Sequence, residues 1–358
     1  MSSALLLIEE KPRHRKKNNG KTAIRIENTF KGLSPIVALV CQAIKHSLRR
    51  SLIEIRRWGV KIMAVSFAFI GFGEAGSEVS AGLLDNGVER IQMYDILLDD
   101  PEERARTLAR AGEIGVKACD SIAEAVFGVD IIFATVTCSA CLVVAEEAAK
   151  HLHPQQYYLD FNSISPGKKR KVRDLIKPSG AHFVEGSVMA NVPGNRQAVP
   201  MFIGGDGGET FIQMARPFGM DLTFIQEEVG QASACKMVRS ITMKGIEALY
   251  LECMQAARHF GIEDEVLDSV VESMKGRDWR EKCNFNMPRS VIHAKRRSDE
   301  MDNVAETLRE IGQEPRMAEA TAETLRWCAS LGLKKKYKDQ LASGYSEVLD
   351  AIEEAKKE

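Results

Sequence analysis

The chain has 358 residues, of which 44% are hydrophobic and 28% are charged. This composition is typical of a globular protein with room for two or three domains. No apolar run approaches the roughly 18 residues needed to cross a bilayer, and the eight cysteines lack the spacing of a small disulfide-stapled domain. We therefore expect a reduced, cytoplasmic protein with no membrane segment.

Residues 1–62 have a strongly positive net charge, unlike the rest of the chain. They hold 14 Lys and Arg against 4 Glu, a net charge of +10, so the rest of the chain has a net charge of −11. Nucleic acid is therefore an unsuitable partner for the body of the protein. We interpret residues 1–62 as a non-catalytic or disordered extension, of the kind left by an upstream start codon. An organellar targeting segment and a nucleic-acid-binding arm are the alternatives.

From Ala64 onward, short apolar runs alternate with helical periodicity, which predicts βαβ units and a parallel sheet. The expected helices between the strands include Glu74–Asn86, Pro101–Ala111 and Ala140–His151. The expected strands are Ala64–Ile70, Arg90–Asp95, Asp130–Thr135, Tyr157–Asp160, His182–Ser187, Val199–Ile203 and Leu222–Gln226.

The strand signal stops at Gln231. The sequence therefore predicts an α/β Rossmann-type domain with a parallel sheet at 63–229, an all-helical domain at 230–335 and a charged tail at 336–358. The helices expected in this half are Ser233–His259, Glu263–Met274, Val291–Ile311, Met317–Leu331 and, in the tail, an exposed charged helix at Ser343–Lys357.

A glycine-rich segment follows the first expected strand and opens the first expected helix. In this context Gly-x-Gly-x-x-Gly is the dinucleotide-binding fingerprint. Gly71 permits the tight turn, Gly73 leaves room for the pyrophosphate, and Gly76 lets the helix pack close to the sheet. The helix N-terminus attracts the phosphate charge. The predicted cofactor-binding residues of this segment are Gly71, Phe72, Gly73, Glu74, Ala75 and Gly76.

Asp95 ends the second expected strand, 19 residues after Gly76. A carboxylate at this place accepts hydrogen bonds from the ribose hydroxyls and repels a 2′-phosphate. No arginine follows closely, so we expect NAD in preference to NADP. The alternative is that Asp95 only caps the segment that follows it.

The loop after the third expected strand lies at the edge of the sheet where ligands bind. Thr135, Val136 and Thr137 are candidates to line the nicotinamide ribose. Cys138 and Cys141 form a Cys-x-x-Cys, but there is no second cysteine pair and no histidine cluster nearby. Packing at a helix start therefore explains them better than redox chemistry or metal binding.

Two further loops leave strands with small polar residues. Ser163 and Ser165 either cap the helix that starts at Pro166, or Ser163 borders the substrate. The basic run 168–173 resembles a nuclear-import signal, although a solvated helix face explains it better. In the second loop, residues 189–191 either offer backbone N–H groups to a carboxylate or only connect two strands.

Lys236 stands near the start of the long expected helix, among small and apolar residues. Desolvation lowers the pKa of an ammonium group, which suits proton transfer near neutral pH. A lysine on a helix is more often simply solvated, so the residues alone leave both interpretations open.

These four segments, in this order, resemble the β-hydroxyacid dehydrogenases, the group that includes 6-phosphogluconate and 3-hydroxyisobutyrate dehydrogenases. The resemblance extends over residues 64–330. It implies a Rossmann domain, a helical C-terminal domain and homo-oligomers built through the helical part. It also implies proton transfer by a lysine on the interdomain helix, whose motif position falls on Lys236.

The sequence departs from the family pattern in the substrate-carboxylate loop, commonly Asp-Ala-Pro-Val-Ser-Gly-Gly. Met189 stands where Ser is usual, Ala190 and Asn191 replace two glycines, and Ser240 stands where the family often has Asn. These departures indicate a divergent branch with its own C-terminal domain. The expected substrate residues are Ser163, Met189, Ala190, Asn191, Arg239 and Ser240, with Lys244, Arg289, His293 and Arg296 as further candidates to recognise an anionic group.

The expected activity is hydride transfer between a nicotinamide and a small β-hydroxy acid or related alcohol, with Lys236 as general acid and base. An anionic small molecule is the expected substrate, although Met189 adds apolar bulk to its loop. One alternative is reduction of C=N bonds, as in imine reductases. The other is a nucleotide-binding regulatory protein without turnover.

Overall fold

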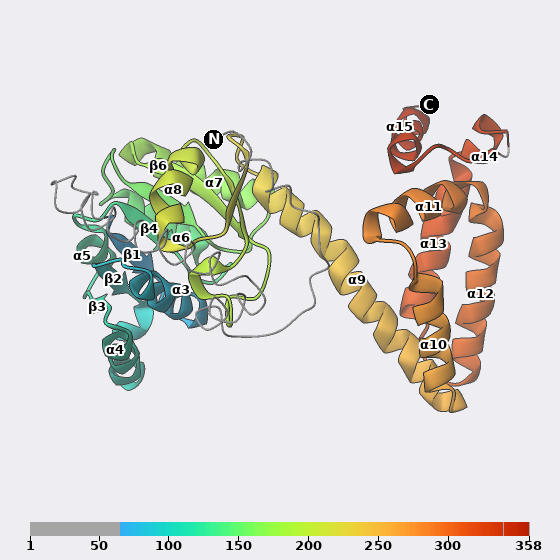
Figure 1. Ribbon diagram of the computed structural model, residues 1–358, viewed down its shortest axis with the longest axis horizontal. Coiled ribbons are helices and arrows are strands. Elements are labelled where there is room, and N and C mark those ends of the chain that lie inside the picture. Colours follow the sequence, from blue (N-terminus) through green and yellow to red (C-terminus); the bar gives the residue numbers. More distant parts are fainter. Residues whose placement is uncertain (1–64, 339, 358) are drawn as a thin grey trace, which may run out of the picture. The chain divides into compact units, whose positions relative to one another are not determined.

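In the computed structural model of the chain, residues 65–338 and 340–357 are described. The basic extension expected at 1–62 lies outside them. The chain divides into two units, the first ending at Met237 and the second beginning at Val238. This boundary falls inside one long helix, α9 (Gln231–Phe260), which is labelled in Figure 1. The domain limits expected from the sequence stay predictions.

The first unit is built on one eight-stranded sheet with the order β3-β2-β1-β4-β5-β6-β7-β8 (Figure 1). All neighbouring strands are parallel except β6 and β7. The short β3 was not predicted. The strands are β1 (Phe67–Ile70), β2 (Ile91–Tyr94), β3 (Lys117–Ala118), β4 (Ile131–Ala134), β5 (Tyr157–Asp160), β6 (His182–Val188), β7 (Met201–Gly204) and β8 (Leu222–Gln226).

The antiparallel pair β6–β7 has a simple cause in the chain between the two strands. Parallel neighbours need a crossover connection, usually a helix. The connection over residues 189–200 contains only the 3-10 turn Arg196–Ala198, so the chain turns back beside β6. The α/β Rossmann-type prediction is confirmed, with this one reversal near an edge of the sheet.

Both faces of the sheet are buried beneath helices. Along β1 the side chains alternate, with Phe67 and Phe69 in one buried cluster and Ala68 and Ile70 in the other. Strands covered on both sides are close to continuously apolar, which explains the unbroken hydrophobic runs of β1 and β4. The helices of this unit are α3 (Glu74–Asp85), α4 (Pro101–Ile114), α5 (Ile122–Val126), α6 (Cys141–Ala149), α7 (Pro166–Ile176) and α8 (Gly208–Ala215).

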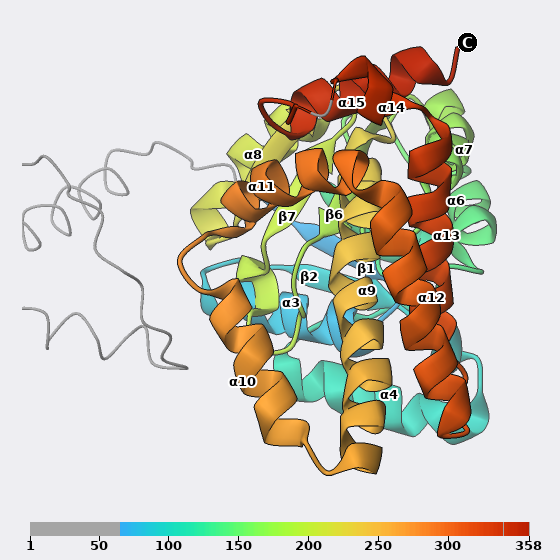
Figure 2. The same cartoon turned by 90° about the vertical axis from the view of Figure 1, so that its right-hand side faces the viewer.

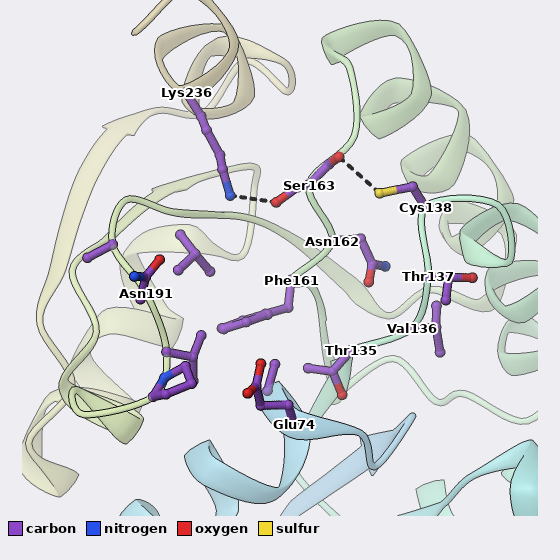
Figure 3. A pocket seen from close by; sticks show the side chains of 15 residues that line it. Glu74, Thr135, Val136, Thr137, Cys138, Phe161, Asn162, Ser163, Asn191 and Lys236 are labelled. Carbon is purple, nitrogen blue, oxygen red and sulfur yellow. Dashed lines mark hydrogen bonds between the residues drawn. The ribbon is translucent and has the colours of Figure 1, made fainter. Parts of the chain in front are cut away.

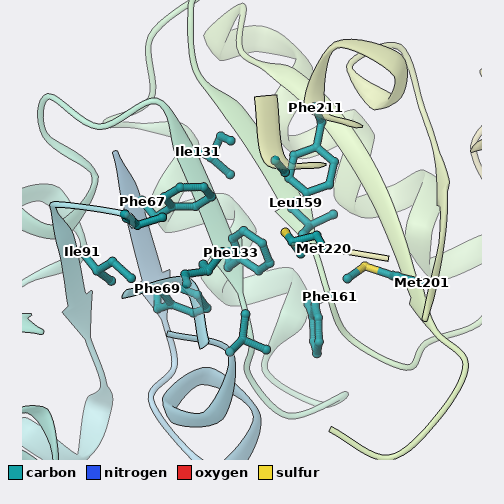
Figure 4. Packing of buried hydrophobic residues seen from close by; sticks show 14 of the residues in the cluster. Phe67, Phe69, Ile91, Ile131, Phe133, Leu159, Phe161, Met201, Phe211 and Met220 are labelled. Atoms are coloured by element: carbon teal, nitrogen blue, oxygen red, sulfur yellow. The ribbon is translucent and has the colours of Figure 1, made fainter. Parts of the chain in front are cut away.

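Phe133 of β4 lies at the centre of the larger cluster (Figure 4). Its ring centroid is 4.9 Å from that of Phe69 and 6.1 Å from those of Phe67, Phe161 and Phe211. These separations fall within the range of favourable aromatic pairs. The rings therefore link β1, β4, α8 and the end of β5 into one packed block.

The second unit is entirely helical in its described residues. Ala305, Leu308 and Ala318 are buried where α12 and α13 lie side by side (Figure 2). No helix in the described part of the chain is both long enough and apolar enough to cross a membrane. After α9, the helices are α10 (Glu263–Met274), α11 (Trp279–Ile292), α12 (Ala294–Glu310), α13 (Arg316–Ser330), α14 (Leu333–Lys336) and α15 (Tyr345–Ala355).

Two expectations for this unit differ from the structure. The helix expected at Val291–Ile311 matches α12 except at its start, because Val291 and Ile292 belong to α11, which was not predicted; the two helices meet at His293, where φ is −105° and ψ is 12°. The tail is not merely an exposed charged helix, because Val348 and Ala351 of α15 are buried in a cluster with Leu333. Their i, i+3 spacing gives the charged helix one apolar stripe that packs inward.

Phe133→Ala is expected to lower the free energy of unfolding of the first unit by about 3–5 kcal/mol, because it opens a cavity in a fully buried aromatic cluster. Phe127, which is 71% exposed, provides the matched control, and Phe127→Ala should change stability by less than about 0.5 kcal/mol. Urea denaturation followed by circular dichroism measures both. Equal destabilisation by the two changes would contradict this description of the core.

Candidate active site

The carboxyl ends of β1 and β4 meet where the strand order reverses. Ile70 lies opposite Ala134 in the register of the two strands, and β2 lies on the other side of β1. Ligands of doubly wound sheets bind at such a switch point. A cavity of about 610 Å³ opens there, lined by Glu74, Ala75, Thr135, Val136, Thr137, Cys138, Phe161, Asn162, Ser163, Val188, Ala190, Asn191, Val192, Pro193 and Lys236 (Figure 3).

The glycine-rich turn is tight in two places and open in the third. Gly71 has a φ of +93°, and a Cβ there would lie 2.6 Å from the carbonyl oxygen of Thr135. A Cβ on Gly76 would lie 2.5 Å from the Gly71 oxygen, whereas a Cβ on Gly73 would meet no described atom within 4 Å. Gly73 has no side chain to cap α3, so the first-turn N–H groups face open space, as a pyrophosphate requires. The turn fits a dinucleotide.

Thr135 joins this turn to the end of β4. Its N–H donates to the oxygen of Ile70 at 2.8 Å, and its hydroxyl donates to the oxygen of Gly71 at 2.6 Å. Both bonds hold the loop after β4 against the glycine turn. The residues expected to line the ribose are therefore brought beside the fingerprint, and Val136 and Thr137 line the same cavity.

Asp95 is buried, with 8% of its surface exposed. One carboxylate oxygen accepts the N–H of Phe72 at 2.5 Å, and the other accepts the N–H of Leu97 at 2.9 Å. The first bond fixes the glycine turn, and the second caps the 3-10 turn Ile96–Leu98. The capping interaction that the sequence left open is thus present, and contact with a ribose stays a prediction.

Lys236 projects from the start of α9 toward the loop after β5 (Figure 3). Its Nζ donates to the hydroxyl of Ser163 at 2.5 Å. On the other side of Ser163, the thiol of Cys138 donates to the Ser163 carbonyl at 3.1 Å. An ammonium and a hydroxyl therefore meet in the cavity, which is the kind of arrangement that proton transfer needs.

The structure does not bring every predicted site residue to this cavity. Phe72 is buried in the core beneath the turn, and Met189 is outside the cavity lining, with its N–H bonded to the oxygen of Pro200. Arg239 and Ser240 lie on the part of α9 that belongs to the second unit.

Six lining residues were not among the predicted site residues. Asn162 had a usable signal, because it precedes Ser163 in the same polar segment. It is buried, and its side-chain nitrogen has no hydrogen-bond partner among the described residues, whereas most buried polar groups have one. The others are Cys138, Phe161, Val188, Val192 and Pro193.

The basic run 168–173 is not uniformly solvated, which corrects the expectation for it. Lys169 is fully buried, because the helical period of α7 places it on the same face as Val172 and Ile176. Burial lowers the pKa of the Lys169 ammonium, while the carboxylates of Asp160 and Glu185 act in the opposite direction. The side chain of Ser165 caps α7 as expected.

Comparisons with known proteins agree with this geometry. Residues 66–218 match the NAD binding domain of 6-phosphogluconate dehydrogenase, and residues 257–328 match a domain of unknown function, DUF1932. A conserved hypothetical protein from Sinorhizobium meliloti 1021 has a solved structure that is 34% identical, with a TM-score of 0.54; the match covers 82% of this chain and 98% of that one. The chain belongs to the β-hydroxyacid dehydrogenase superfamily.

Two further proteins are similar to this chain. The mitochondrial 3-hydroxyisobutyrate dehydrogenase of Drosophila melanogaster is 24% identical over 63% of this chain and 68% of its own length. An imine reductase from Myxococcus stipitatus, solved with NADP+, is 18% identical with a TM-score of 0.56, and the match covers 75% of this chain and 95% of that one. The second likeness shows the fold alone.

The two cysteines of the Cys-x-x-Cys should react differently with iodoacetamide. Cys138 is exposed in the cavity, whereas Cys141 is 1% exposed and burial raises the pKa of its thiol. Because the thiolate is the reactive form, we expect Cys138 to be alkylated while Cys141 stays unmodified in the folded protein. Peptide mass spectrometry after a timed reaction measures both. Faster alkylation of Cys141 would contradict the packing described for α6.

Proposed function

We propose that the protein is an NAD(P)-dependent dehydrogenase that transfers a hydride between the nicotinamide and the hydroxyl-bearing carbon of a small β-hydroxy acid or related alcohol. The observation that carries the proposal is the contact of Lys236 with Ser163 at the cavity beside the glycine turn. A group that can take up or release a proton there complements hydride transfer to or from the same carbon.

Several residues of the cavity have a defined task in this proposal. The nicotinamide, when bound, accepts or supplies the hydride. The first-turn N–H groups of α3 bind the pyrophosphate, and Thr135 and Thr137 contact the adjoining ribose. Phe161 and Val188 exclude water from the reacting carbon, which strengthens the polar contacts beside them.

Lys236 takes the hydroxyl proton in the direction of oxidation and returns it to the carbonyl oxygen in the direction of reduction. Ser163 accepts a hydrogen bond from Lys236 and offers its own hydrogen to the substrate oxygen, so it orients that oxygen toward the amine. Asn191 and Asn162 hold the rest of the substrate. Oxidation of a substrate with a β-carboxylate gives a β-oxo acid, which can lose CO₂ in a separate later step.

The loop after β6 supports a small anionic substrate. Ala190 and Asn191 line the cavity, and a small anionic group suits a loop with N–H groups to offer. Arg239 and Ser240 are proposed as further substrate residues through the family resemblance.

Reduction of C=N bonds is the second candidate, because the fold is shared with imine reductases. Lys236 favours hydroxyl chemistry, since a hydroxyl must lose a proton when it is oxidised. A regulatory protein without turnover is the third candidate. Assays with hydroxy acids, and with a ketone and an amine together, separate the three.

Homo-oligomers built through the second unit are also proposed, with a second copy of this chain as the partner. The family resemblance implies them. Tyr250 and Leu251 of α9 are more than half exposed and line a groove with Met254, and exposed apolar patches of this kind favour association.

Lys236→Met is expected to lower kcat about 10²- to 10⁴-fold, the usual contribution of a general acid or base. The Kd for the nicotinamide cofactor should stay unchanged, because the pyrophosphate is held by the backbone of α3. Lys150, which pairs with Glu147 on the surface, provides the control: Lys150→Met should keep full activity. Nicotinamide absorbance with a hydroxy-acid panel measures kcat, and a Lys236→Met variant with normal kcat would refute the proposal.

NAD is the proposed cofactor in preference to NADP, because the carboxylate of Asp95 would repel the 2′-phosphate of NADP. Asp95→Ala should raise the Kd for NAD about tenfold or more, through the lost ribose contact and the lost bond to Phe72. The Kd for NADP should rise less, because the variant no longer repels the 2′-phosphate. Asp100, which caps α4 by accepting the N–H of Glu102 at 2.9 Å, provides a matched control in Asp100→Ala. Fluorescence titration measures the constants, and equal rises for both cofactors would leave Asp95 with a capping role only.

A further inference from the structure

Three charged side chains are fully buried in the sheet domain without a task in the chemistry above. Asp160 ends β5, Glu185 lies on β6, and Lys169 lies on α7, each with 0% of its surface exposed. Such residues are almost never fully buried unless they are paired. A buried ion group costs desolvation free energy, and apolar residues of similar volume often stabilise a fold as well or better. Stability alone is therefore a weak explanation for the three charges.

Glu185 holds the start of the helix that carries Lys236. One of its carboxylate oxygens accepts the N–H of Gly230 at 2.7 Å, and the other accepts the N–H of Ser233 at 2.8 Å. A carboxylate at a helix N-terminus also meets the positive end of the helix dipole. Lys236 follows Ser233 by three residues, less than one turn. The direction of the first turn of α9 thus depends on Glu185.

Asp160 holds the turn that carries Ser163. Its Oδ1 accepts the N–H of Asn162 at 2.9 Å, one residue before Ser163. The hydroxyl that contacts Lys236 is therefore fixed by a second buried carboxylate. In the register of β5 and β6, Asp160 and Glu185 lie directly opposite each other.

Lys169 connects the two carboxylate-bearing strands. Its Nζ donates to the carbonyl oxygens of Asp160 at 2.7 Å and Gly186 at 2.9 Å, and lies 3.4 Å from Oδ1 of Asp160. One ammonium thus clamps the ends of β5 and β6 together and offsets the negative charge of both carboxylates.

We infer that Asp160, Lys169 and Glu185 are positioning residues that set the contact between Lys236 and Ser163. The inference rests on the proposed function and deepens it. Each carboxylate fixes the backbone beneath one member of the pair, and the lysine fixes the two carboxylate-bearing strands relative to each other. Directional hydrogen bonds to backbone groups give Lys236 and Ser163 a single geometry that apolar packing would not specify. Misplacement of such a pair by about 1 Å can lower the reaction rate about a hundredfold.

Glu185→Gln tests the inference, since it keeps the shape of the side chain and replaces one acceptor with an NH₂ group that faces a backbone N–H. The first turn of α9 should shift, Lys236 should leave Ser163, and its amine should become more reactive. The readout is the rate of acetylation of Lys236 by acetic anhydride in the full chain, measured by peptide mass spectrometry relative to Lys150. We expect this ratio to rise several-fold.

Glu252 provides the matched control, because it accepts the N–H groups of Met317 and Ala318, both at 2.8 Å, at the start of α13 in the second unit. Glu252→Gln should leave the acetylation of Lys236 unchanged. A rise of similar size in both variants would show general loosening, and no rise in Glu185→Gln would show that Lys236 is held without Glu185; either result overturns the inference.

Asp160→Asn is the second variant and decides the matter if Glu185→Gln does not fold. It removes the negative charge that pairs with Lys169 and so loosens the clamp between β5 and β6, while it keeps an acceptor for the N–H of Asn162. It too should raise the acetylation ratio of Lys236. An unchanged ratio would overturn the inference.

Activity is a separate readout. In Glu185→Gln, kcat should fall about tenfold to a hundredfold with an unchanged Kd for the cofactor. Wild-type protein without turnover on hydroxy acids would refute the dehydrogenase proposal, and the acetylation ratio would still decide whether these residues position Lys236.

Discussion

Ile70 and Ala134 lie opposite each other on β1 and β4, and the chain leaves the sheet at both places. The N–H of Thr135 bonds to Ile70 and its hydroxyl to Gly71, so the two departing loops are held as one piece. All other features of the site are arranged around this pairing. The glycine turn is tight on one side because Thr135 occupies the space that a side chain on Gly71 would need.

Phe161 belongs both to the hydrophobic core and to the lining of the cavity. Its ring belongs to the aromatic block around Phe133, and it also lines the cavity beside Ser163. Close-packed interiors transmit displacement because they have few voids. The floor of the cavity is therefore as rigid as the sheet beneath it. Asn162 and Ser163, on the adjoining loop, are fixed by the packing of Phe161 and by the hydrogen bond from the N–H of Asn162 to the buried carboxylate of Asp160.

Much of the fold could be predicted from the sequence because its signals are local. The strand–glycine–helix context at Gly71 identified the switch point, and the loss of alternating strands after Gln231 identified the helical half. The contact between Lys236 and Ser163 joins residues 73 positions apart, so no local pattern predicted it, and the family resemblance indicated only the role of Lys236. The prediction for Lys169 was wrong because of its charge. The helical pattern places Lys169 on the same face as buried residues, but a charged side chain is expected to be exposed to solvent unless its buried partners are known. The reversal at β7 follows from a connection over residues 189–200 without a crossover helix, whereas the break at His293 lies inside a continuous helical pattern that gives no local sign of it.

The packing of α15 has a consequence for the order in which the protein folds during synthesis. Val348 and Ala351 complete a cluster that also needs Leu333 and Val291, whereas the last strand of the sheet ends at Gln226. Domains generally fold as units, with the N-terminal one first as the chain emerges from the ribosome. The sheet can therefore acquire all its strands while translation continues, but this cluster of the helical unit cannot close until the residues of α15 have been made. Until then its apolar surfaces are exposed to chaperones and to neighbouring nascent chains.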